Sequence, residues 1–568
     1  TKTEAKDAKE LKFWHATLKE IQAEQSLELR YQGLVRHLNS LSDSKGAVAA
    51  EAQLYILDAL LRIWIRSIPN SNLGVAALIW DRVRGLSGIS DSLTKTISKR
   101  IQATIQVLGM PALPFTEPSA DRPLPVPFIL DQLKPAQLKD LSLPKEESPK
   151  EFQLLHCGPY MDRSMDSAPD ARVPFNPDGW QRKVLDEIDA NKSLLVVAPT
   201  SAGKTFISFY AMRRILEADD DGVLVYVAPT KALVNQIAAE IQARYSKSFK
   251  HAGKSVWGIH TRDYRINNPT GCQVLVTVPH ILQIMLLAPS NAEKKNSWSN
   301  RVKRIIFDEV HCIGQAEDGI IWEQLLLFAP CPIIALSATV GNPEEFNDWL
   351  ASTQKASNRE MVMIKHPHRY SDLRKYVYSP PKTFTFDGLP DRPAVSAPGL
   401  DGVASLADFH PVASLINKSR GMPDDLSLEA RDCLLLWRSM TKHQKSGFEL
   451  DARLHPSKAL GNDIIRKPDV IKWEGQLKAV LRAWMSKADS PFETVREELS
   501  LPLRSISRQP YQRSSALSTQ AEKKGDDANE VDPNDLSSTT LPLLCDLEAK
   551  GALPAILFNY DRTACEKL

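Results

Sequence analysis

Two short segments carry residues whose types and spacing suit the chemistry of phosphate groups. Residues 198–205 read APTSAGKT, and residues 308–311 read DEVH. A glycine-rich loop between a strand and a helix presents backbone N–H groups and a helix N-terminus to phosphates. In such a loop Lys204 reaches the β- and γ-phosphates, and the hydroxyl of Thr205 holds Mg²⁺. The first segment therefore predicts a phosphate-binding loop.

The tripeptide G-K-[ST] occurs twice, and context separates the two copies. Gly203 follows the apolar run SLLVVA and opens the helical segment KTFISFYAMRRIL, whereas Gly253, in AGKS, follows the polar stretch ARYSKSFKH. A phosphate loop needs a strand before it and a helix after it. We expect the first copy to be the phosphate loop and the second to be a surface turn.

The acidic segment follows the apolar run RIIF, at the strand end where open α/β sheets bind ligands. Asp308 would contact Mg²⁺, usually through water, and Glu309 would orient and deprotonate an attacking water as a general base. His311 and Cys312 are adjacent and have no further ligands nearby, so we do not predict a metal pair. We expect His311 to couple the nucleotide site to the rest of the domain.

Two flanking segments add candidate residues. SAT (337–339) follows the run PIIAL, and the hydroxyls of Ser337 and Thr339 could bond Asp308 or His311. In FNPDGWQ, Gln181 could read the adenine edge and Phe175 could stack near it. The alternative for the second segment is a helix-start glutamine and a core phenylalanine.

The elements that must position these residues alternate in type. Five short apolar runs are separated by longer amphipathic segments, and they lie at 193–198, 223–228, 274–278, 304–307 and 332–336. Buried strands alternating with helices favour a parallel, doubly wound α/β fold of the P-loop kind.

Composition excludes several other classes. The 568 residues carry a net charge of +2, with 43% apolar and 25% charged residues, as in ordinary globular proteins. No run approaches the ~18 apolar residues of a membrane span, and the N-terminal segment is too charged for a signal peptide. The seven cysteines form no CxxC pair, which favours reduced thiols in the cytoplasm.

The composition along the chain predicts seven segments. They are a helical region (1–110), a Pro-rich linker (111–154), the α/β domain (155–378), a second linker (379–409), a helical insertion (410–500), a disordered low-complexity stretch (501–540) and a final segment (541–568) with the apolar strand PAILF. Within the first region we expect Trp64 and Trp80 to be core aromatics.

The motifs together resemble those of a known family. APTSAGKT, APTKAL (228–233), DEVH and SAT are similar to motifs I, Ia, II and III of superfamily-two DExD/H-box helicases, in the spelling of the Ski-like branch. Residues 156–181, 368–378 and 541–568 resemble the DExD/H-box helicase sixty family, cytosolic proteins linked to antiviral RNA responses.

The resemblance implies a larger machine than one α/β domain. It implies two RecA-like lobes with ATP between them, with 155–378 as the first lobe and 541–568 as the opening of the second. ATP-binding positions are then Phe175, Gln181 and the loop residues Thr200, Ser201, Ala202, Gly203, Lys204 and Thr205. We expect residues 1–568, as a fragment without the second lobe's arginines, to bind nucleotide but hardly hydrolyse it.

The resemblance also implies positions that bind a nucleic-acid strand. Pro229, Thr230 and Lys231 would face the phosphodiester backbone. Weaker motifs add Thr261 and Asp263 in HTRDYR, and Thr277 and Pro279 in TVPH, where His280 replaces the usual Glu. Small hydroxyls and N–H groups bind phosphate without reading sequence. The alternative is that all of these are ordinary turn residues.

The leading hypothesis is an ATP- and Mg²⁺-dependent RNA helicase or RNA-remodelling ATPase. One alternative is a DNA helicase with the same ATP-binding motifs, because the motifs do not show whether 2′-hydroxyl groups are contacted. An RNA-sensing adaptor, which uses ATP to change shape and recruits a protein partner through its helical regions without unwinding, is the other.

Overall fold

The computed structural model divides the chain into two compact units, which are described separately. The helical unit comprises residues 1–163 and 372–568, and the lobe comprises residues 164–371. The structure describes residues 2–41, 46–67, 73–89, 92–114, 118, 121–145, 147–291, 297–314, 319–338, 340–389, 395, 399–423, 425–506, 529–532 and 535–567.

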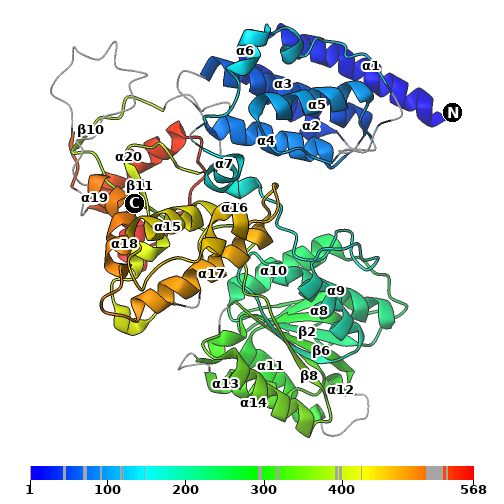
Figure 1. Cartoon of the computed structure of the whole chain (residues 1–568). Helices are drawn as coiled ribbons and strands as arrows, with labels where there is room; N and C mark the ends of the chain where they lie inside the picture. The colour runs from blue at the N-terminus through cyan, green and yellow to red at the C-terminus, as the bar shows by residue number, and fades with distance from the viewer. Residues whose placement is uncertain are drawn as a thin grey trace. The chain divides into compact units, whose positions relative to one another are not determined.

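The lobe is built on an eight-stranded sheet (Figure 1). The order is β4-β3-β5-β2-β6-β7-β1-β8, and every pairing is parallel except that of the edge strand β4. Its strands are β1 (Ser193–Val197), β2 (Val223–Val227), β3 (Ser255–His260), β4 (Arg265–Ile266), β5 (Cys272–Thr277), β6 (Val302–Phe307), β7 (Ile333–Ser337) and β8 (Met361–Lys365). The predicted doubly wound parallel sheet is confirmed.

Helices cover both faces of the sheet because successive strand residues point to opposite sides. In β1, Leu194 and Val196 join the core under α8, α9 and α10, while Leu195 and Val197 join the core under α13 and α14. The helices of the lobe are α8 (Gly179–Asp189), α9 (Lys204–Ala218), α10 (Lys231–Arg244), α11 (Pro279–Leu286), α12 (Trp298–Arg301), α13 (Gly319–Phe328) and α14 (Pro343–Ala356). Continuous burial of β1, β2, β5 and β7 explains why these strands are unbroken apolar runs.

Strand order decides which motifs meet. The phosphate loop follows β1, SAT follows β7 and DEVH follows β6, and these three strands are neighbours. The segments that follow β2, β5 and β3 leave the same edge of the sheet, on the side of β6 away from β7 and β1. Parallel strands thus bring every motif to one edge, where such sheets bind ligands.

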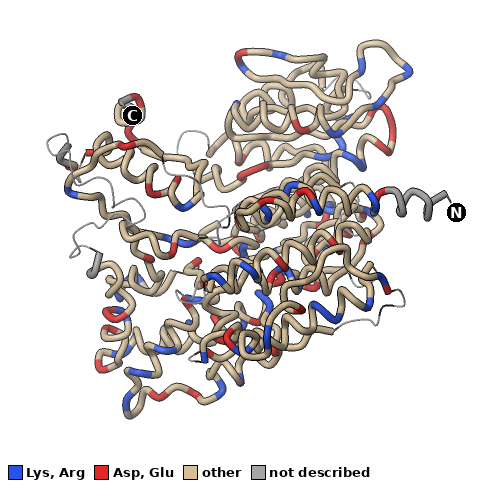
Figure 2. Tube along the Cα trace, turned by 90° about the horizontal axis from the view of Figure 1, so that it is seen from above, with Lys and Arg blue, Asp and Glu red and all other residues tan. Residues whose placement is uncertain are grey.

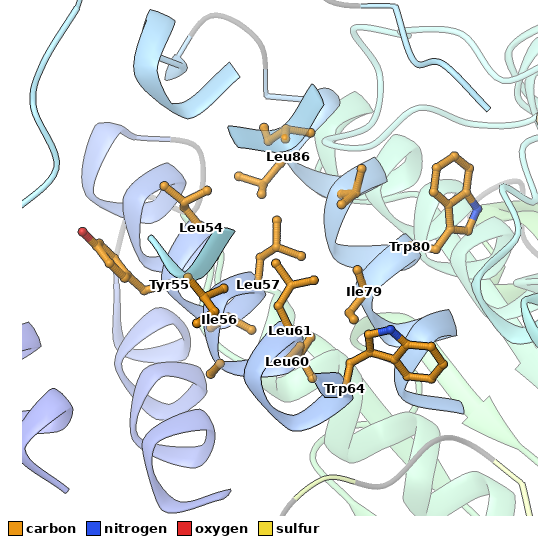
Figure 3. Packing of buried hydrophobic residues seen from close by; sticks show 14 of the residues in the cluster. Leu54, Tyr55, Ile56, Leu57, Leu60, Leu61, Trp64, Ile79, Trp80 and Leu86 are labelled. Atoms are coloured by element: carbon orange, nitrogen blue, oxygen red, sulfur yellow. The ribbon is translucent and has the colours of Figure 1, made fainter. Parts of the chain in front are cut away.

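The first core of the helical unit surrounds one helix. α3 (Ala47–Ser67) is buried along most of its length, and Trp64 and Trp80 are 2% and 1% exposed, so both are core aromatics as predicted (Figure 3). The surrounding helices are α1 (Lys2–Ala23), α2 (Leu27–Ser40), α4 (Leu73–Ser87) and α5 (Lys95–Leu108).

The Pro-rich segment 111–154, expected to be a linker, packs on this core instead. Phe128 and Leu130 are buried in it, and the backbone N–H of Ile129 donates to Asp58 of α3 at 2.6 Å. Tyr55 donates to the carbonyl of Val126 at 2.7 Å. Prolines end helices without preventing burial of the apolar residues between them. Short helices here are 3-10 Ile129–Asp131, α6 (Pro135–Lys139) and α7 (Pro149–His156).

A second core lies mainly in the region 410–500, where most of its residues lie on helices. This core also contains Leu154 and Met161, which precede the lobe in the sequence. The region 410–500 therefore does not form a core of its own. Its helices are α15 (Ala430–His443), α16 (Pro456–Ala459), α17 (Lys467–Met485) and α18 (Phe492–Leu499).

The chain leaves and re-enters the helical unit at neighbouring points. Arg163 Nη2 lies 3.9 Å from Asp372 Oδ2, and Lys467 forms a closer ion pair with the same carboxylate. The backbone N–H of Lys467 donates to the carbonyl of Asp162 at 2.8 Å. We call Arg163, Asp372 and Lys467 the clasp.

The remaining segments correct two expectations. The expected linker 379–409 contains two short strands. β11 (Leu406–Asp408) pairs with β9 (Tyr376–Tyr378), and β10 (Thr383–Phe384) pairs with β12 (Asn529–Glu530). PAILF (554–558) forms no strand, because no described strand lies beside it to complete its hydrogen bonds, and Phe558 is 90% exposed.

The low-complexity region is described only in part. Most of it, residues 507–528, for which we expect disorder, lies outside the described residues. Its ends are helical, in α19 (Leu501–Ile506) and α20 (Leu536–Ala549), followed by α21 (Arg562–Lys567).

Two features concern the surface as a whole. Lys and Arg are interspersed with Asp and Glu along the trace, in agreement with a net charge of +2 (Figure 2). Within the described part of the chain, none of the helices combines the length and apolarity that crossing a bilayer requires.

Candidate nucleotide and nucleic-acid site

The phosphate loop connects β1 to α9 as predicted from its context. Gly203 caps α9 at φ +89° and Ser201 has φ +69°, so two left-handed residues curl the loop. A side chain at Gly203 would also place its Cβ 3.3 Å from Gln181 Nε2. Ala202 is fully buried, whereas Thr200 and Thr205 are exposed at the mouth of the loop. The second G-K-S copy is a surface turn before β3, with Gly253 at φ +84°.

Lys204 lies inside the curl of the loop. Its Nζ donates to the carbonyl of Ala198 at 2.7 Å. Burial lowers the pKa of Lys204, while the nearby carboxylates of Glu309 and Asp308 act in the opposite direction. A partly desolvated ammonium between carboxylates is suited to attract phosphate strongly, because the local dielectric is low.

The acidic pair leaves β6 next to the loop. Asp308 is held by two donors: the Tyr226 hydroxyl bonds one oxygen, and the Glu309 backbone N–H donates to the other at 3.0 Å. Burial, and then Asp308, raise the pKa of Tyr226, so the phenol stays a donor. Glu309 itself has a left-handed φ of +51°, and none of the described residues donates a hydrogen bond to its buried Oε2.

His311 connects the acidic pair to β7. Its Nδ1 lies 3.2 Å from Ser337 Oγ and 3.4 Å from Glu309 Oε2. The structure therefore brings together the two described residues for which we predicted coupling, and their role stays a prediction. Thr339, the third, lies outside the described residues.

The residues expected near adenine take two different places. Gln181 is buried; its Oε1 accepts from the backbone N–H of Asp178 at 3.0 Å, and its Nε2 donates to the carbonyl of Ala202 at 3.3 Å. It caps α8 and braces the loop at once. Phe175 is 44% exposed and packs edge-on against Phe206 of α9 at 5.5 Å, so part of its ring is free to stack.

Three of the expected strand-binding residues lie at the other half of the edge, and two of them, Thr230 and Lys231, are exposed. Thr230 caps α10 and accepts from the backbone N–H of Leu233 at 3.4 Å. Lys231 forms an ion pair with Asp263, and this hydrogen bond lowers the pKa of the carboxyl. Pro229, just before them, is partly exposed.

Two expected hydroxyls are turned inward, which corrects their assignment as phosphate contacts. Thr277 is fully buried and donates to the carbonyl of His260 at 2.6 Å. Thr261 is 2% exposed and closes a turn with Tyr264. Pro279 is buried as the first residue of α11. A hydroxyl that is buried and bonded in this way is not presented to a ligand.

Two residues at the site escaped the sequence analysis. Tyr226 lies next to the last residue of a fully buried apolar strand. A buried tyrosine hydroxyl needs a partner, which is the signal that could have found it. Arg369 donates to the hydroxyl of Thr200 at 3.1 Å; it lies in the segment 368–378 that carries part of the resemblance, but no role was assigned to it there.

The fold and site define the class: a mostly parallel sheet with a Walker A-type loop after β1 and an Asp-Glu pair after β6 is typical of a P-loop, RecA-like lobe. Residues 178–346 match the family described as DEAD/DEAH box helicase. Over this range the chain is therefore similar to DEAD/DEAH box helicases.

Relatives extend the similarity beyond the lobe. The chain is 35% identical over 427 residues to an uncharacterised helicase of Caenorhabditis elegans, covering 73% of this chain and 23% of that protein. It is 33% identical over 376 residues to the probable ATP-dependent RNA helicase DDX60-like of Homo sapiens, covering 59% of this chain and 20% of that protein.

A more distant relative matches the Ski-like branch. Superkiller complex protein 2 of Mus musculus is 33% identical over 213 residues, which cover 37% of this chain and 15% of that protein. In each case the chain spans less than a quarter of the relative's length. These relatives bear out the resemblance to superfamily-two RNA helicases.

Proposed function

We propose that this chain supplies the ATP-binding and ATP-hydrolysing lobe of an ATP-dependent RNA helicase or RNA-remodelling ATPase. One observation carries the proposal: Lys204, Asp308, Glu309 and the His311–Ser337 contact gather at the ends of three neighbouring strands. The preference for RNA is supported by the relative described as a probable ATP-dependent RNA helicase.

The donor set fits a nucleotide with Mg²⁺. Hydroxyl and carboxylate oxygens suit this ion, which keeps several waters. Thr205 and, through water, Asp308 would hold it, and the two hydrogen bonds on Asp308 fix the carboxylate. When bound, the ion neutralises charge on the β- and γ-phosphates.

The chain's own residues supply the remaining steps. Lys204 exchanges the Ala198 carbonyl for phosphate oxygens. Glu309 Oε2, to which no group of the described chain donates a hydrogen bond, takes a proton from the attacking water. His311 lies within 3.4 Å of that oxygen and 3.2 Å of Ser337, so it would transmit the change in charge to β7.

The strand of nucleic acid would lie along Pro229, Thr230 and Lys231. These residues are exposed on the same edge of the sheet, and they carry one cation and one hydroxyl. Such contacts bind backbone phosphate and tolerate any sequence, so affinity should fall with salt at about −0.7 in log–log slope per phosphate neutralised.

ATP hydrolysis by the full-length protein tests the proposal. We expect stimulation by single-stranded RNA, and we expect Lys204→Ala to lose nucleotide binding and Glu309→Gln to bind ATP but lower turnover at least 100-fold. Lys254→Ala is the matched control, because it alters the other G-K-S copy, whose lysine pairs with Asp221 at the surface. Unchanged hydrolysis in Lys204→Ala would refute the proposal.

The same assay separates the alternatives. Equal or greater stimulation by DNA of matched length would favour a DNA helicase. ATP binding without RNA-stimulated hydrolysis would favour the adaptor. Slow turnover by residues 1–568 alone, the antiviral association and the cytoplasmic location remain predictions.

A further inference from the structure

The segment that follows β8 leaves the sheet beside the phosphate loop. β8 pairs in parallel with β1, and Val197, the last residue of β1, accepts a hydrogen bond from the His366 backbone at 2.8 Å. His366 is buried and its ring stacks on Trp180 at 4.9 Å. Residues 366–371 are therefore anchored at their start, where the loop begins.

Two side chains of this segment contact the loop. Arg369 Nη1 donates to Thr200 Oγ1 at 3.1 Å. Ser371 Oγ lies 3.4 Å from Ser201 Oγ. Both loop residues precede Gly203, in the part of the loop whose backbone encloses phosphate. The guanidinium is thus held at the mouth of the loop by a contact that occupies one of its five N–H donors.

Among the described residues, the charge of Arg369 is not neutralised by a carboxylate. It is exposed, and across the described residues no carboxylate forms an ion pair with it. Its field reaches the loop lysine, because Arg369 contributes to lowering the pKa of Lys204 after burial. An anion bound between Lys204 and Arg369 would offset the repulsion between these two cations.

We propose that Arg369 is a further nucleotide-binding residue, which contacts the terminal phosphates of the nucleotide from the same lobe as the loop. The inference rests on the proposed function. A guanidinium matches phosphate oxygens with two parallel N–H bonds, which an ammonium cannot do. Arg369 then distinguishes nucleoside triphosphate and diphosphate from monophosphate.

The test measures binding of ATPγS and AMP to the full 568-residue chain by titration calorimetry. We expect Arg369→Ala to weaken ATPγS binding about tenfold or more, the size of a lost charge-assisted hydrogen bond, and to change AMP binding less than twofold. Arg369→Lys should recover part of the loss, because it keeps the charge without the fork. Arg453→Ala, which removes an 88% exposed arginine paired with Asp451, is the charge-matched control.

The outcomes separate this inference from the proposed function. Full ATPγS affinity in Arg369→Ala, with binding lost in Lys204→Ala, would overturn the inference and leave the function standing. An equal loss of affinity for ATPγS and for AMP would mean that Arg369 only holds the loop in shape, and this result would also overturn the inference. Failure of the unmodified chain to bind ATPγS would overturn both.

Discussion

At the scale of single residues, the most unusual group outside the nucleotide site is a pair of carboxyls at the start of α15. Glu429 and Asp432 are each 6% exposed. Arg374 bonds Glu429 at 2.7 Å, and Asp432 Oδ2 accepts from the Glu429 backbone at 3.1 Å. Burial raises the pKa of both carboxyls to about 7.

This pair predicts how stability depends on pH. Asp432 ionises near pH 3.8 when unfolded and about 7 when folded, so its contribution to stability is present below pH 4 and is lost as pH rises through 7. Asp432→Asn keeps a cap acceptor and does not titrate. We expect it to raise the free energy of unfolding of the helical unit by about 1–3 kcal/mol at pH 8, and hardly at pH 4.

Urea unfolding at pH 4, 6 and 8 measures this difference. Burial lowers the pKa of His410 to about 4, which acts in the opposite direction as pH falls, but it is common to both proteins and cancels. Asp432→Ala, which removes the cap as well, should be less stable than Asp432→Asn at every pH. A variant Asp432→Asn that is weaker than the parent at pH 8 would contradict the assignment.

At the scale of elements, the two glycines of the G-K-S and G-K-T copies offer a matched comparison. Both adopt left-handed backbone, at φ +89° for Gly203 and +84° for Gly253, so alanine costs about 1–2 kcal/mol at either. Only at Gly203 does the added Cβ meet a neighbour, Gln181 Nε2 at 3.3 Å.

We therefore expect similar destabilisation but different effects on binding. Gly203→Ala should weaken ATPγS binding at least tenfold, because the loop must open to relieve the contact with Gln181. Gly253→Ala should leave affinity within twofold, since nothing lies within 4 Å of its Cβ. Calorimetry on both variants checks this, and equal affinities would show that the curl at Gly203 is not needed.

The elements also show what local pattern can predict. β1, β2, β5, β6 and β7 were found because central parallel strands are unbroken apolar runs. The apolar runs do not predict β3 and β8, because these strands lie near the edges of the sheet. Each is only half buried at its first three residues, so neither needs an unbroken apolar run. The packing of 126–130 on α3 rests on contacts about 70 residues apart, such as Ile129 with Asp58, which no local pattern reports.

The site residues that could be predicted from the sequence are those that lie within contiguous motifs. The loop around Lys204 and the pair Asp308–Glu309 lie where expected, because each ends a buried strand. Thr261 and Thr277 share the residue type of phosphate ligands, but the turn and strand that they close bury them. Arg369 reaches the loop only because β8 lies beside β1, which the sequence does not state.

At the scale of the whole molecule, the two units have separate cores and should respond separately to nucleotide. The cores of the lobe contain residues 184–364, whereas those of the helical unit contain residues on both sides of the lobe. A ligand that binds only the folded lobe, at 100 times its Kd, stabilises it by about 2.7 kcal/mol.

Thermal unfolding followed by calorimetry tests this independence. We expect ATPγS at that concentration to raise the Tm of one transition by about 5–10 °C and to leave the other unchanged. Lys204→Ala should remove the shift. A single transition that moves as a whole would mean that the units unfold together.

The second helical core is built from residues on both sides of the lobe, so the ribosome makes its parts at different times. Leu154 and Met161 are made before the lobe, but the residues that bury them begin near Val412. At about 5–20 residues per second, the ribosome takes about 10–40 s to make residues 164–371. During that interval α7 keeps an apolar face without its partners, and the lobe becomes complete in sequence, and able to fold, before those partners are made. Order of emergence, and not only final stability, therefore sets when this protein is most exposed to aggregation and to chaperones.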